Sequence, residues 1–324
     1  MVKADGYGLG AGPVSRRLWA EGARRFFVAR IAEGEALRAE MGERQAQILV
    51  LDGLTAGGTD RLLAASLTPV LNSLDELDAW AAPGRSAALH VDTGMNRLGL
   101  APECAAQAVE RIAATGLKLE FVMSHLAGAG DRADPRSARQ LAAFQAVQGH
   151  FPGVPASLAA SAGIYLDPAY HFDIVRPGIC LFGGGPRDRP DPRFRAVATL
   201  TAPVLQVNTI QAGETAGYGH MFTAARPTII AMIGAGYADG LPRASFVRGV
   251  ACIGGRAAPY AIVTMDMIGL DVTDIGSVAP GDEVELLGPN AQLDDVAAAA
   301  DGVVAHEILV RLSRRAARRY LGGA

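Results

Sequence analysis

Short apolar runs alternate with longer amphipathic or alanine-rich stretches in the first half of the chain. Seven of these runs have the length and composition of buried parallel strands: 26–29, 48–51, 69–71, 87–91, 119–124, 156–160 and 172–175. Stretches between them, such as 32–41, 102–114 and 135–149, have helical length and begin near proline or acidic residues. The pattern predicts the repeated βαβ units of an α/β, TIM-type (β/α)8 barrel.

The eighth strand of such a barrel is expected immediately before Lys3, so the first strand is predicted to be missing. An open barrel exposes two strand edges and leaves Lys3 without its backbone frame, so the chain as written is expected to be unstable or poorly active. The simplest explanation is that Met1 is an internal methionine of a longer reading frame. A native product with the calculated mass of 33.6 kDa would exclude that explanation.

The pattern changes after the glycine-, proline- and arginine-rich stretch 183–195. Runs rich in β-branched residues then alternate with glycine and proline turns, at 200–210, 228–233, 261–264 and 283–287. We therefore predict a barrel domain over 1–190 and a mainly antiparallel β domain with a terminal helix over 191–324. That helix is expected over 306–321, with its arginines favouring the helix C-terminus.

The overall composition supports a large folded core and argues against several classes of protein. The chain has 324 residues, of which 50% are hydrophobic and 19% charged. Its formal net charge of −3 gives no long-range attraction to nucleic acid or to anionic membranes. No apolar run approaches the roughly 18 residues of a membrane span. Three widely spaced cysteines, without metal-type spacing, favour a reducing cytoplasm and predict no metal site.

The polar residues expected at the carboxyl ends of the barrel strands are the candidates for chemistry. Lys3 is notable among them, because only two of the 30 basic residues are lysines. A desolvated lysine amine can lose its proton and attack a carbonyl, which arginine cannot do. Phenols, hydroxyls, glycine amides and arginines complete the set, which suits a phosphorylated aldehyde.

Six motifs, in order across both predicted domains, closely resemble those of the pyridoxal phosphate (PLP)-dependent alanine racemases. They are 2–8 (VKADGYG), 92–99 (DTGMNRLG), 175–179 (VRPGI), 217–219 (GYG), 236–240 (GYADG) and 264–266 (TMD). The resemblance runs from Lys3 nearly to the last residue. It implies the two-domain fold, PLP as cofactor and racemisation of alanine.

The resemblance also implies a role for each matching residue around the cofactor. Lys3 corresponds to the Schiff-base lysine. Arg176 corresponds to the partner of the pyridine nitrogen, and His125 to the residue that supports this arginine. An arginine leaves the ring nitrogen unprotonated, which favours reprotonation over transamination. The phosphate ligands are implied to be Tyr7, Ser161 and the backbone amides of Gly178 and Ile179.

Racemisation needs bases on both faces of the planar intermediate. Lys3 is implied to serve the D-enantiomer, and Tyr218, contributed by the partner subunit, to serve the L-enantiomer. Tyr237 and Met265 are implied to line the substrate entrance. Arg97 is implied to orient the Tyr218 phenol or the substrate carboxylate. The active unit implied by the family is a two-fold homodimer with two composite sites.

Two positions depart from the family pattern. His306 stands where many members have a tyrosine that reaches the phosphate, and an imidazole can still donate one hydrogen bond there. His90 occupies a position that is a carbamylated lysine in many relatives. Histidine cannot form that anion, so Arg97 is expected to be braced by another group.

The expected function is alanine racemase activity that supplies D-alanine for peptidoglycan. One alternative is a PLP-binding or PLP-homeostasis protein, or a degenerate racemase without turnover; the retained Tyr218, Tyr237 and Met265 argue against it. A PLP decarboxylase of the same barrel class would present a glutamate to the ring nitrogen, so Arg176 argues against that. A dinucleotide-binding loop at 6–10 lacks the required G-x-G-x-x-G spacing.

Overall fold

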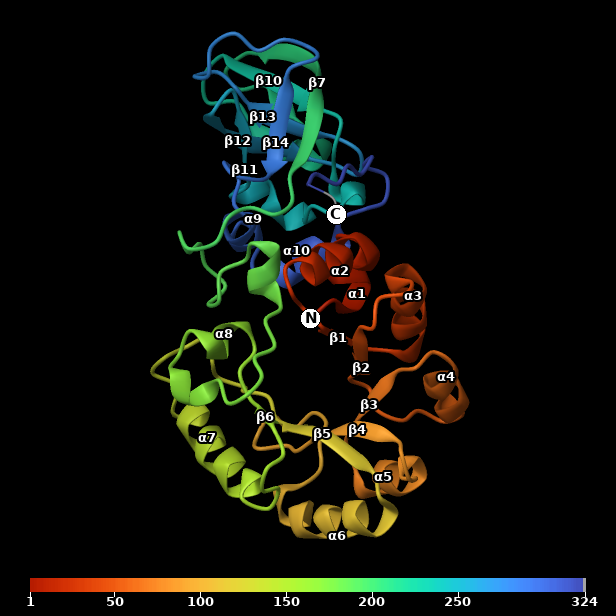
Figure 1. Cartoon of the computed structure of the whole chain (residues 1–324). Helices are drawn as coiled ribbons and strands as arrows, with labels where there is room; N and C mark the ends of the chain where they lie inside the picture. Colours follow the sequence, from red (N-terminus) through yellow and green to blue (C-terminus); the bar gives the residue numbers. More distant parts are fainter. Residues whose placement is uncertain (323–324) are drawn as a thin grey trace. The chain divides into compact units, whose positions relative to one another are not determined.

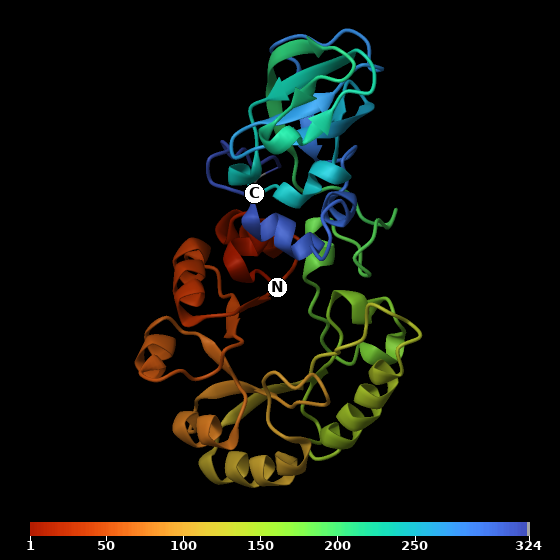
Figure 2. The ribbon, with the colours of Figure 1, turned by 180° about the vertical axis from the view of Figure 1, so that it is seen from behind.

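The computed structural model describes residues 1–322 and divides into two compact units, Met1–Gly178 and Ile179–Leu321 (Figure 1). The first unit contains a six-stranded parallel sheet in the order β1-β2-β3-β4-β5-β6. Its strands are β1 (Arg25–Val28), β2 (Gln47–Val50), β3 (Thr68–Leu71), β4 (Ser86–His90), β5 (Lys118–Met123) and β6 (Ala156–Ser157). The sheet is strongly curved, and the helices cover its outer side (Figures 1 and 2). The prediction of a TIM-type α/β architecture is confirmed.

Each of the five connections between successive parallel strands contains a helix, as a βαβ series requires, and three further helices lie before β1 or after β6. The helices are α1 (Lys3–Tyr7), α2 (Ala11–Ala20), α3 (Ile31–Met41), α4 (Gly58–Ala64), α5 (Leu74–Trp80), α6 (Ala105–Thr115), α7 (Pro135–Gln148) and α8 (Ser161–Ile164), with short 3₁₀ turns at η1 (Pro102–Cys104) and η2 (Pro168–Tyr170). Helix α7 shows how sequence sets the boundaries: the Asp134 carboxylate accepts from the Arg136 amide, and Pro135 occupies the first turn.

Both faces of the parallel strands are buried, which explains why their sequences read as continuous apolar runs. Side chains on alternate positions of β1 belong to two different clusters. Phe26 and Val28 pack with the helices, whereas Phe27 packs with Leu49 and Phe121 inside the curve of the sheet. Phe27 and Phe121 meet edge to face, with ring centroids 6.1 Å apart.

The predicted strand at 172–175 is wrong. Only an isolated parallel bridge between Ala160 and Arg176 forms in this region. Phe172 has a left-handed φ of 50°, and the Asp173 carboxylate accepts from the Ala156 amide at 2.8 Å, so the segment bends instead of extending.

At the other side of the sheet, the Val2 amide donates to the Phe27 carbonyl of β1 at 2.9 Å, which places Lys3 beside the end of that strand.

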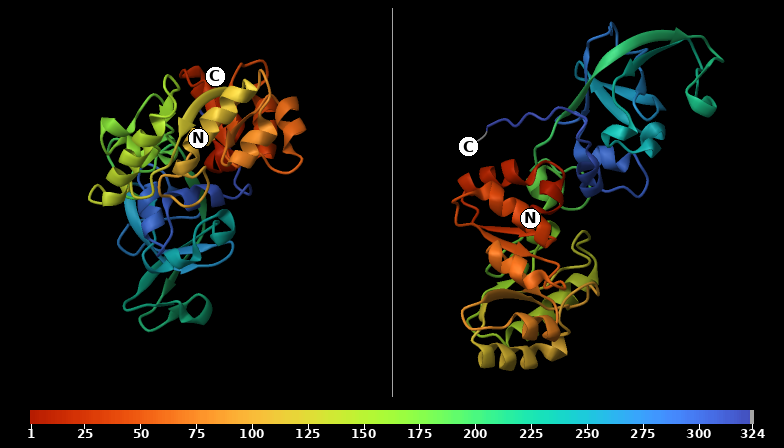
Figure 3. Two further views of the ribbon diagram at one scale, coloured as in Figure 1. Left: turned by 90° about the horizontal axis from the view of Figure 1, so that it is seen from below. Right: turned by 90° about the vertical axis from the view of Figure 1, so that its right-hand side faces the viewer.

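The second unit is a closed antiparallel barrel in the order β10-β13-β12-β11-β14-β7, which confirms the predicted β domain. Its strands are β7 (Leu200–Ile210), β10 (Thr228–Ile233), β11 (Val250–Ile253), β12 (Arg256–Val263), β13 (Ile268–Asp271) and β14 (Glu283–Leu287). A separate hairpin joins β8 (Thr215–Ala216) to β9 (Phe222–Thr223). Turns and helices add η3 (Ile179–Phe182), η4 (Tyr218–His220), η5 (Tyr237–Asp239), η6 (Arg243–Val247), α9 (Leu293–Ala298) and α10 (Ala305–Arg311). Strand β7 runs beyond the barrel toward the segment that carries η4 (Figure 3, right).

The predicted terminal helix over 306–321 is also wrong beyond Arg311. Helix α10 ends there, and Leu312 leaves the helical region with ψ of 116°. Tertiary contacts replace the helical ones: the Ser313 amide donates to the Asp239 carbonyl, and the Arg315 guanidinium binds Asp266 at 2.8 Å. Within residues 1–322, no helix is long and apolar enough to span a membrane.

Candidate active site

The predicted site residues of the first unit gather at the carboxyl ends of its strands, as expected for this architecture. His90 is the last residue of β4, and His125 follows β5 by two positions. Arg176 is joined to the end of the β6 segment by its bridge to Ala160. Lys3 lies beside β1, next to the Val2 amide that pairs with Phe27. The sheet therefore brings together side chains that are up to 173 positions apart, the separation between Lys3 and Arg176.

Lys3 opens a turn of left-handed backbone. Ala4, Asp5 and Gly6 have φ values of 52°, 55° and 63°, and Tyr7 also has a positive φ of 55°. This conformation costs about 1–2 kcal/mol for each non-glycine residue. It is held by hydrogen bonds from the Gly6 amide to the Val2 carbonyl, and from the Ala11 amide to the Asp5 carboxylate at 2.9 Å. Strained backbone maintained in this way is typical of functional sites.

The Lys3 amine is partly withdrawn from water and surrounded by charged groups of both signs. Burial and the positive charge of Arg97 lower the pKa of Lys3, while Glu33 and Asp52 act in the opposite direction. A lysine whose pKa is lowered has a larger fraction of neutral, nucleophilic amine at working pH. The electrostatics of the turn therefore support covalent chemistry with a carbonyl compound.

Arg176 is 3% exposed, and its hydrogen-bond partners among residues 1–322 are all neutral. Its guanidinium donates to the Ser157 hydroxyl at 2.6 Å, the Ser124 carbonyl at 2.6 Å and the Leu158 carbonyl at 3.2 Å. Burial lowers the pKa of Arg176 to about 10, so the group keeps its charge at neutral pH. A buried cation without a carboxylate partner favours an anionic or electron-rich ligand beside it.

The two histidines of the site are neutral and have defined roles in hydrogen bonding. His125 Nδ1 lies 3.3 Å from an Arg176 nitrogen and must accept, because arginine only donates. Burial, followed by Arg176, lowers the pKa of His125 to about 3. His90 Nδ1 lies 2.9 Å from Asn72 Oδ1, which makes Nδ1 the protonated nitrogen. Nε2 of His90 is buried and has no hydrogen-bond partner within residues 1–322.

The buried imidazole of His90 predicts a specific pH dependence of folding. Burial and Arg176 lower its pKa from 6.5 to about 4, so between these values the unfolded chain binds a proton that the native protein does not. Stability should therefore fall as the pH falls through this window, by up to about 1.4 kcal/mol per pH unit from this group. Urea unfolding at pH 7, 6 and 5 should show a flatter pH dependence for His90→Gln than for the native chain. His150→Gln, at an exposed position, is the control; equal slopes for native and His90→Gln would contradict the assignment.

Donors for a phosphate lie at the end of the Arg176 segment. The Gly178 amide donates to the Ser161 hydroxyl at 2.8 Å, and both residues are in the first unit. A Cβ added at Gly178 would overlap the Tyr7 hydroxyl, so a larger residue there would displace the phenol from the backbone. Tyr7 and Ser161 are buried, as is Ile179, which begins η3. A lysine amine, a buried arginine and this donor set fit PLP.

Apart from the buried Ile179, the predicted site residues of the second unit are exposed. Tyr218 in η4 is 79% exposed, Met265 53% and Tyr237 38%. The Tyr237 amide donates to the Thr264 carbonyl at 3.0 Å, so the Tyr237 and Met265 segments lie together. His306, near the start of α10, is exposed, and so is Arg97 in the first unit.

Three residues with contacts to these segments could not be assigned from the sequence. Glu33 accepts from the Ala4 amide, Asn72 orients His90, and Arg315 binds Asp266 and lies 3.6 Å from Asp239. Each contact joins positions distant in the chain, and none of these residues lies in a motif.

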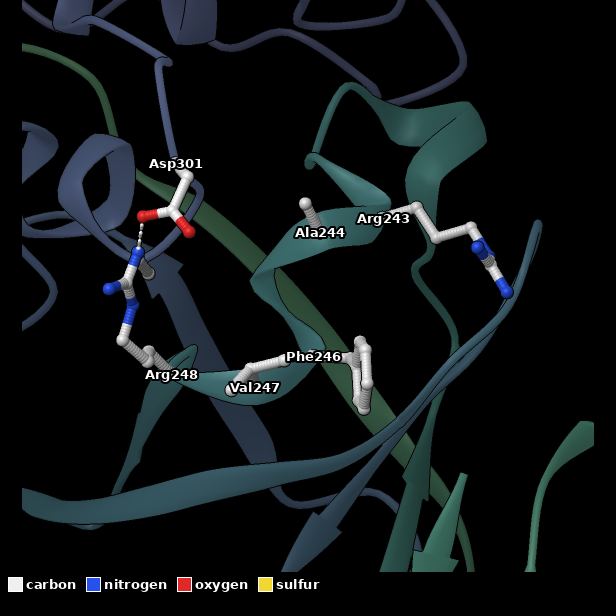
Figure 4. Close-up of a pocket in the computed structure, with 7 residues that line it drawn as sticks. Arg243, Ala244, Phe246, Val247, Arg248 and Asp301 are labelled. Carbon is white, nitrogen blue, oxygen red and sulfur yellow. Dashed lines mark hydrogen bonds and ion pairs between the residues drawn. The ribbon is translucent and has the colours of Figure 1, made fainter. Parts of the chain in front are cut away.

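A surface pocket of the second unit contains none of the predicted site residues (Figure 4). It is lined by Arg243, Ala244, Phe246, Val247, Arg248, Ala299 and Asp301. We therefore place the candidate active site at the predicted residues and not at this pocket.

Comparison with known proteins agrees with this geometry. Residues 1–186 match the family model of the alanine racemase N-terminal domain, and residues 197–320 that of the C-terminal domain. The chain is 42% identical to the catabolic alanine racemase of Agrobacterium fabrum, covering 99% of this chain and 85% of the relative. It is also 42% identical to the alanine racemase of Rhodospirillum rubrum, with coverage of 99% and 88%.

Solved structures give the same result. The alanine racemase of Bartonella henselae, with covalently bound pyridoxal phosphate, aligns with a TM-score of 0.90 and 34% identity, covering 99% of this chain and 91% of the other. The biosynthetic alanine racemase of Pseudomonas aeruginosa aligns with a TM-score of 0.89 and 32% identity, covering 98% and 90%. The chain therefore belongs to the alanine racemase family and is a PLP-dependent amino-acid racemase.

Proposed function

We propose that the protein interconverts L-alanine and D-alanine as a two-fold homodimer, with Lys3 and Tyr218 as the two bases. The observation that carries the proposal is the Lys3 turn: an amine with a lowered pKa beside the end of β1, in the same unit as a buried Arg176 that donates to neutral groups. The domain that binds the cofactor is proposed to span residues 1–190, and the β domain with the terminal segment 191–324.

PLP, when bound, withdraws electrons from the α-carbon of an attached amino acid and so makes its α-proton acidic. Lys3 would hold the cofactor through its amine and move a proton on one face of the α-carbon. Tyr218 would move a proton on the opposite face. Two bases are needed because a single base tends to return the proton to the face that it left.

Arg176 would donate to the pyridine nitrogen. Its guanidinium keeps its own proton and cannot protonate the ring, which favours return of the proton to the α-carbon over transamination. The Ser157, Ser124 and Leu158 contacts, together with His125, fix the orientation of the guanidinium.

The phosphate of the cofactor is proposed to bind the Tyr7 and Ser161 hydroxyls and the Gly178 and Ile179 amides, with His306 as an additional donor. The contact between the Gly178 amide and the Ser161 hydroxyl supports this role, because two of the proposed donors are already adjacent. Backbone amides and hydroxyls are suitable ligands for a dianion.

The homodimer is supported by the exposure of the residues proposed to act on substrate. Tyr218 is 79% exposed, and strand β7 leads into its segment as that strand extends beyond the barrel (Figure 3, right). A large aromatic side chain held out in this way is suited to completing the site of a second copy. Arg97 would orient the Tyr218 phenol or the substrate carboxylate, and Tyr237 and Met265 would line the entrance.

Arg315 is expected to stabilise the entrance segments. Its guanidinium binds Asp266, next to Met265, and lies 3.6 Å from Asp239 in the Tyr237 turn. Because the Arg315 and Asp266 side chains are exposed, Arg315→Ala should lower kcat/KM by about fivefold or less, mainly through a higher KM for alanine. Steady-state kinetics of Arg315→Ala and of the exposed control Arg319→Ala would check this. Equal kinetic constants for the two variants would contradict the role.

We further propose that D-alanine made by the enzyme supplies peptidoglycan synthesis in the cytoplasm. A relative that is 42% identical is named catabolic, and a solved structure that is 32% identical is named biosynthetic, so the biological role needs its own test. A D-alanine-auxotrophic bacterium that expresses this chain is expected to grow in medium without added D-alanine.

The direct test of the activity is the rate of D-alanine formation from L-alanine by the purified chain with PLP, accompanied by its mass in solution. We expect turnover in both directions and a dimeric mass. PLP binding without turnover would instead support the alternative, a PLP-binding protein or a degenerate racemase.

A further inference from the structure

We propose that Glu33 is a positioning residue for the reaction, which fixes the left-handed turn behind Lys3 and thereby the direction of the Lys3 amine. The inference rests on the proposed function of Lys3. Glu33 lies in the first turn of α3, outside the motifs that point to the active site.

One carboxylate joins two segments that are separate in the chain. Glu33 Oε1 accepts from the Ala4 amide at 2.8 Å. Its other oxygen, Oε2, accepts from the Ala29 amide at 2.7 Å and the Arg30 amide at 3.2 Å. The residue directly after Lys3 is thus tied to the connection between β1 and α3.

Helix capping explains only half of this arrangement. A glutamate at the third position of a helix commonly accepts from the backbone amide at the helix start, and the Oε2 contact with Arg30 does so. The Oε1 contact reaches 29 positions back, to a residue with φ of 52°. The strained Ala4 backbone is therefore supported by a carboxylate from a different element.

Glu33 also contributes negative charge near the amine. The charged groups that act on Lys3 are Arg97, which lowers its pKa, and Glu33 and Asp52, which raise it. The positive charge of Lys3 in turn lowers the pKa of His125 and of the Met1 amino group. Asp52 has no contact with the Lys3 turn within the described residues; its carboxylate pairs with Arg30 at 3.8 Å. Substitutions at Asp52 and Glu33 can therefore distinguish the effect of negative charge on the Lys3 pKa from the effect of the hydrogen bond that holds Ala4.

Four variants make that separation. Glu33→Gln removes the charge, and its single carbonyl oxygen cannot accept from both segments. Glu33→Asp keeps the charge, but its shorter side chain cannot hold both segments. Asp52→Asn removes a charge and leaves both anchoring contacts. Glu35→Gln removes a carboxylate from the same helix, where Glu35 pairs with Arg61 at 2.6 Å, and serves as the matched control.

The first readout is the pH dependence of Lys3 acetylation in the cofactor-free protein, measured by peptide mass spectrometry. Lys118, the other lysine, is exposed and provides an internal reference. The midpoint for Lys3 should move to lower pH in Glu33→Gln and in Asp52→Asn, because each loses a charge that raises the Lys3 pKa. It should not move in Glu35→Gln.

The second readout is kcat of the holoenzyme at the pH optimum of each variant. Glu33→Gln and Glu33→Asp should lose about 10- to 100-fold, because small displacements of a reacting group are costly. Asp52→Asn and Glu35→Gln should stay within a few-fold of the native chain. Thermal unfolding of each variant confirms that it is folded; if Glu33→Gln does not fold, Glu33→Asp decides alone.

Two results together would overturn the proposal and leave Glu33 as a helix cap. One is that Glu33→Asp keeps the native kcat. The other is that the acetylation midpoint of Lys3 is the same in Glu33→Gln as in Glu35→Gln. The native chain separates this outcome from failure of the proposed function. If the native holoenzyme has no turnover, the proposed racemase function fails; if it is active while the Glu33 variants match Glu35→Gln, only the positioning role is wrong.

Discussion

Lys3→Ala should lower racemisation in both directions by about 10⁴-fold or more, because it removes one of the two proposed bases and the amine that holds the cofactor. The substitution shortens a partly exposed side chain and leaves the backbone contacts of the turn in place, so the variant should fold. Initial rates from L-alanine and from D-alanine, with saturating PLP, measure the effect.

Lys118→Ala provides the control for this experiment. Lys118 is exposed at the start of β5 and pairs only with Glu120 among the described residues. Its removal should leave both rates unchanged. A Lys3→Ala enzyme within tenfold of the native rate would exclude Lys3 as the covalent and basic residue.

Tyr218→Phe should lower racemisation by about 10²- to 10⁴-fold while leaving one half of the reaction active. The phenol hydroxyl is lost, but the ring remains, and its 79% exposure makes a folding defect unexpected. Lys3 is retained, so exchange of the α-proton of D-alanine with deuterium from solvent should continue. Exchange from L-alanine should be lost together with racemisation.

Nuclear magnetic resonance of each enantiomer in deuterium oxide measures this asymmetry directly. Tyr170→Phe, which removes a phenol hydroxyl from η2 of the first unit, is the matched control and should exchange both enantiomers. Equal loss of exchange from D- and L-alanine in Tyr218→Phe would contradict the assignment of opposite faces.

The strands were predictable where burial alone determines the pattern. Segments 200–210, 228–233 and 283–287 were predicted at the bounds of β7, β10 and β14, because β-branched runs between turns are specific for strands. Segment 172–175 has the same apolar character, but an Asp173 side-chain contact and a left-handed Phe172 redirect it. The 306–321 segment has helical propensity, yet Arg315 and Ser313 make tertiary contacts that end the helix at Arg311.

Lys3 could be predicted as a site residue because lysine is scarce in this chain and because of the motif around it. The anchoring of its turn could not, because the Glu33 contact joins α3 to Ala4 and depends on where the strands place both segments. The neutral state of His90 depends likewise on Asn72 and on burial beside Arg176. Such properties belong to the folded arrangement and have no local signal.

Reduction of the PLP-loaded native protein with borohydride, followed by peptide mapping, identifies the lysine that holds the cofactor. The reagent makes a lysine–cofactor linkage permanent, and the two lysines of the chain fall on different peptides. We expect one pyridoxyl group on Lys3 and none on Lys118. A label on Lys118, or no label on either lysine, would contradict this expectation.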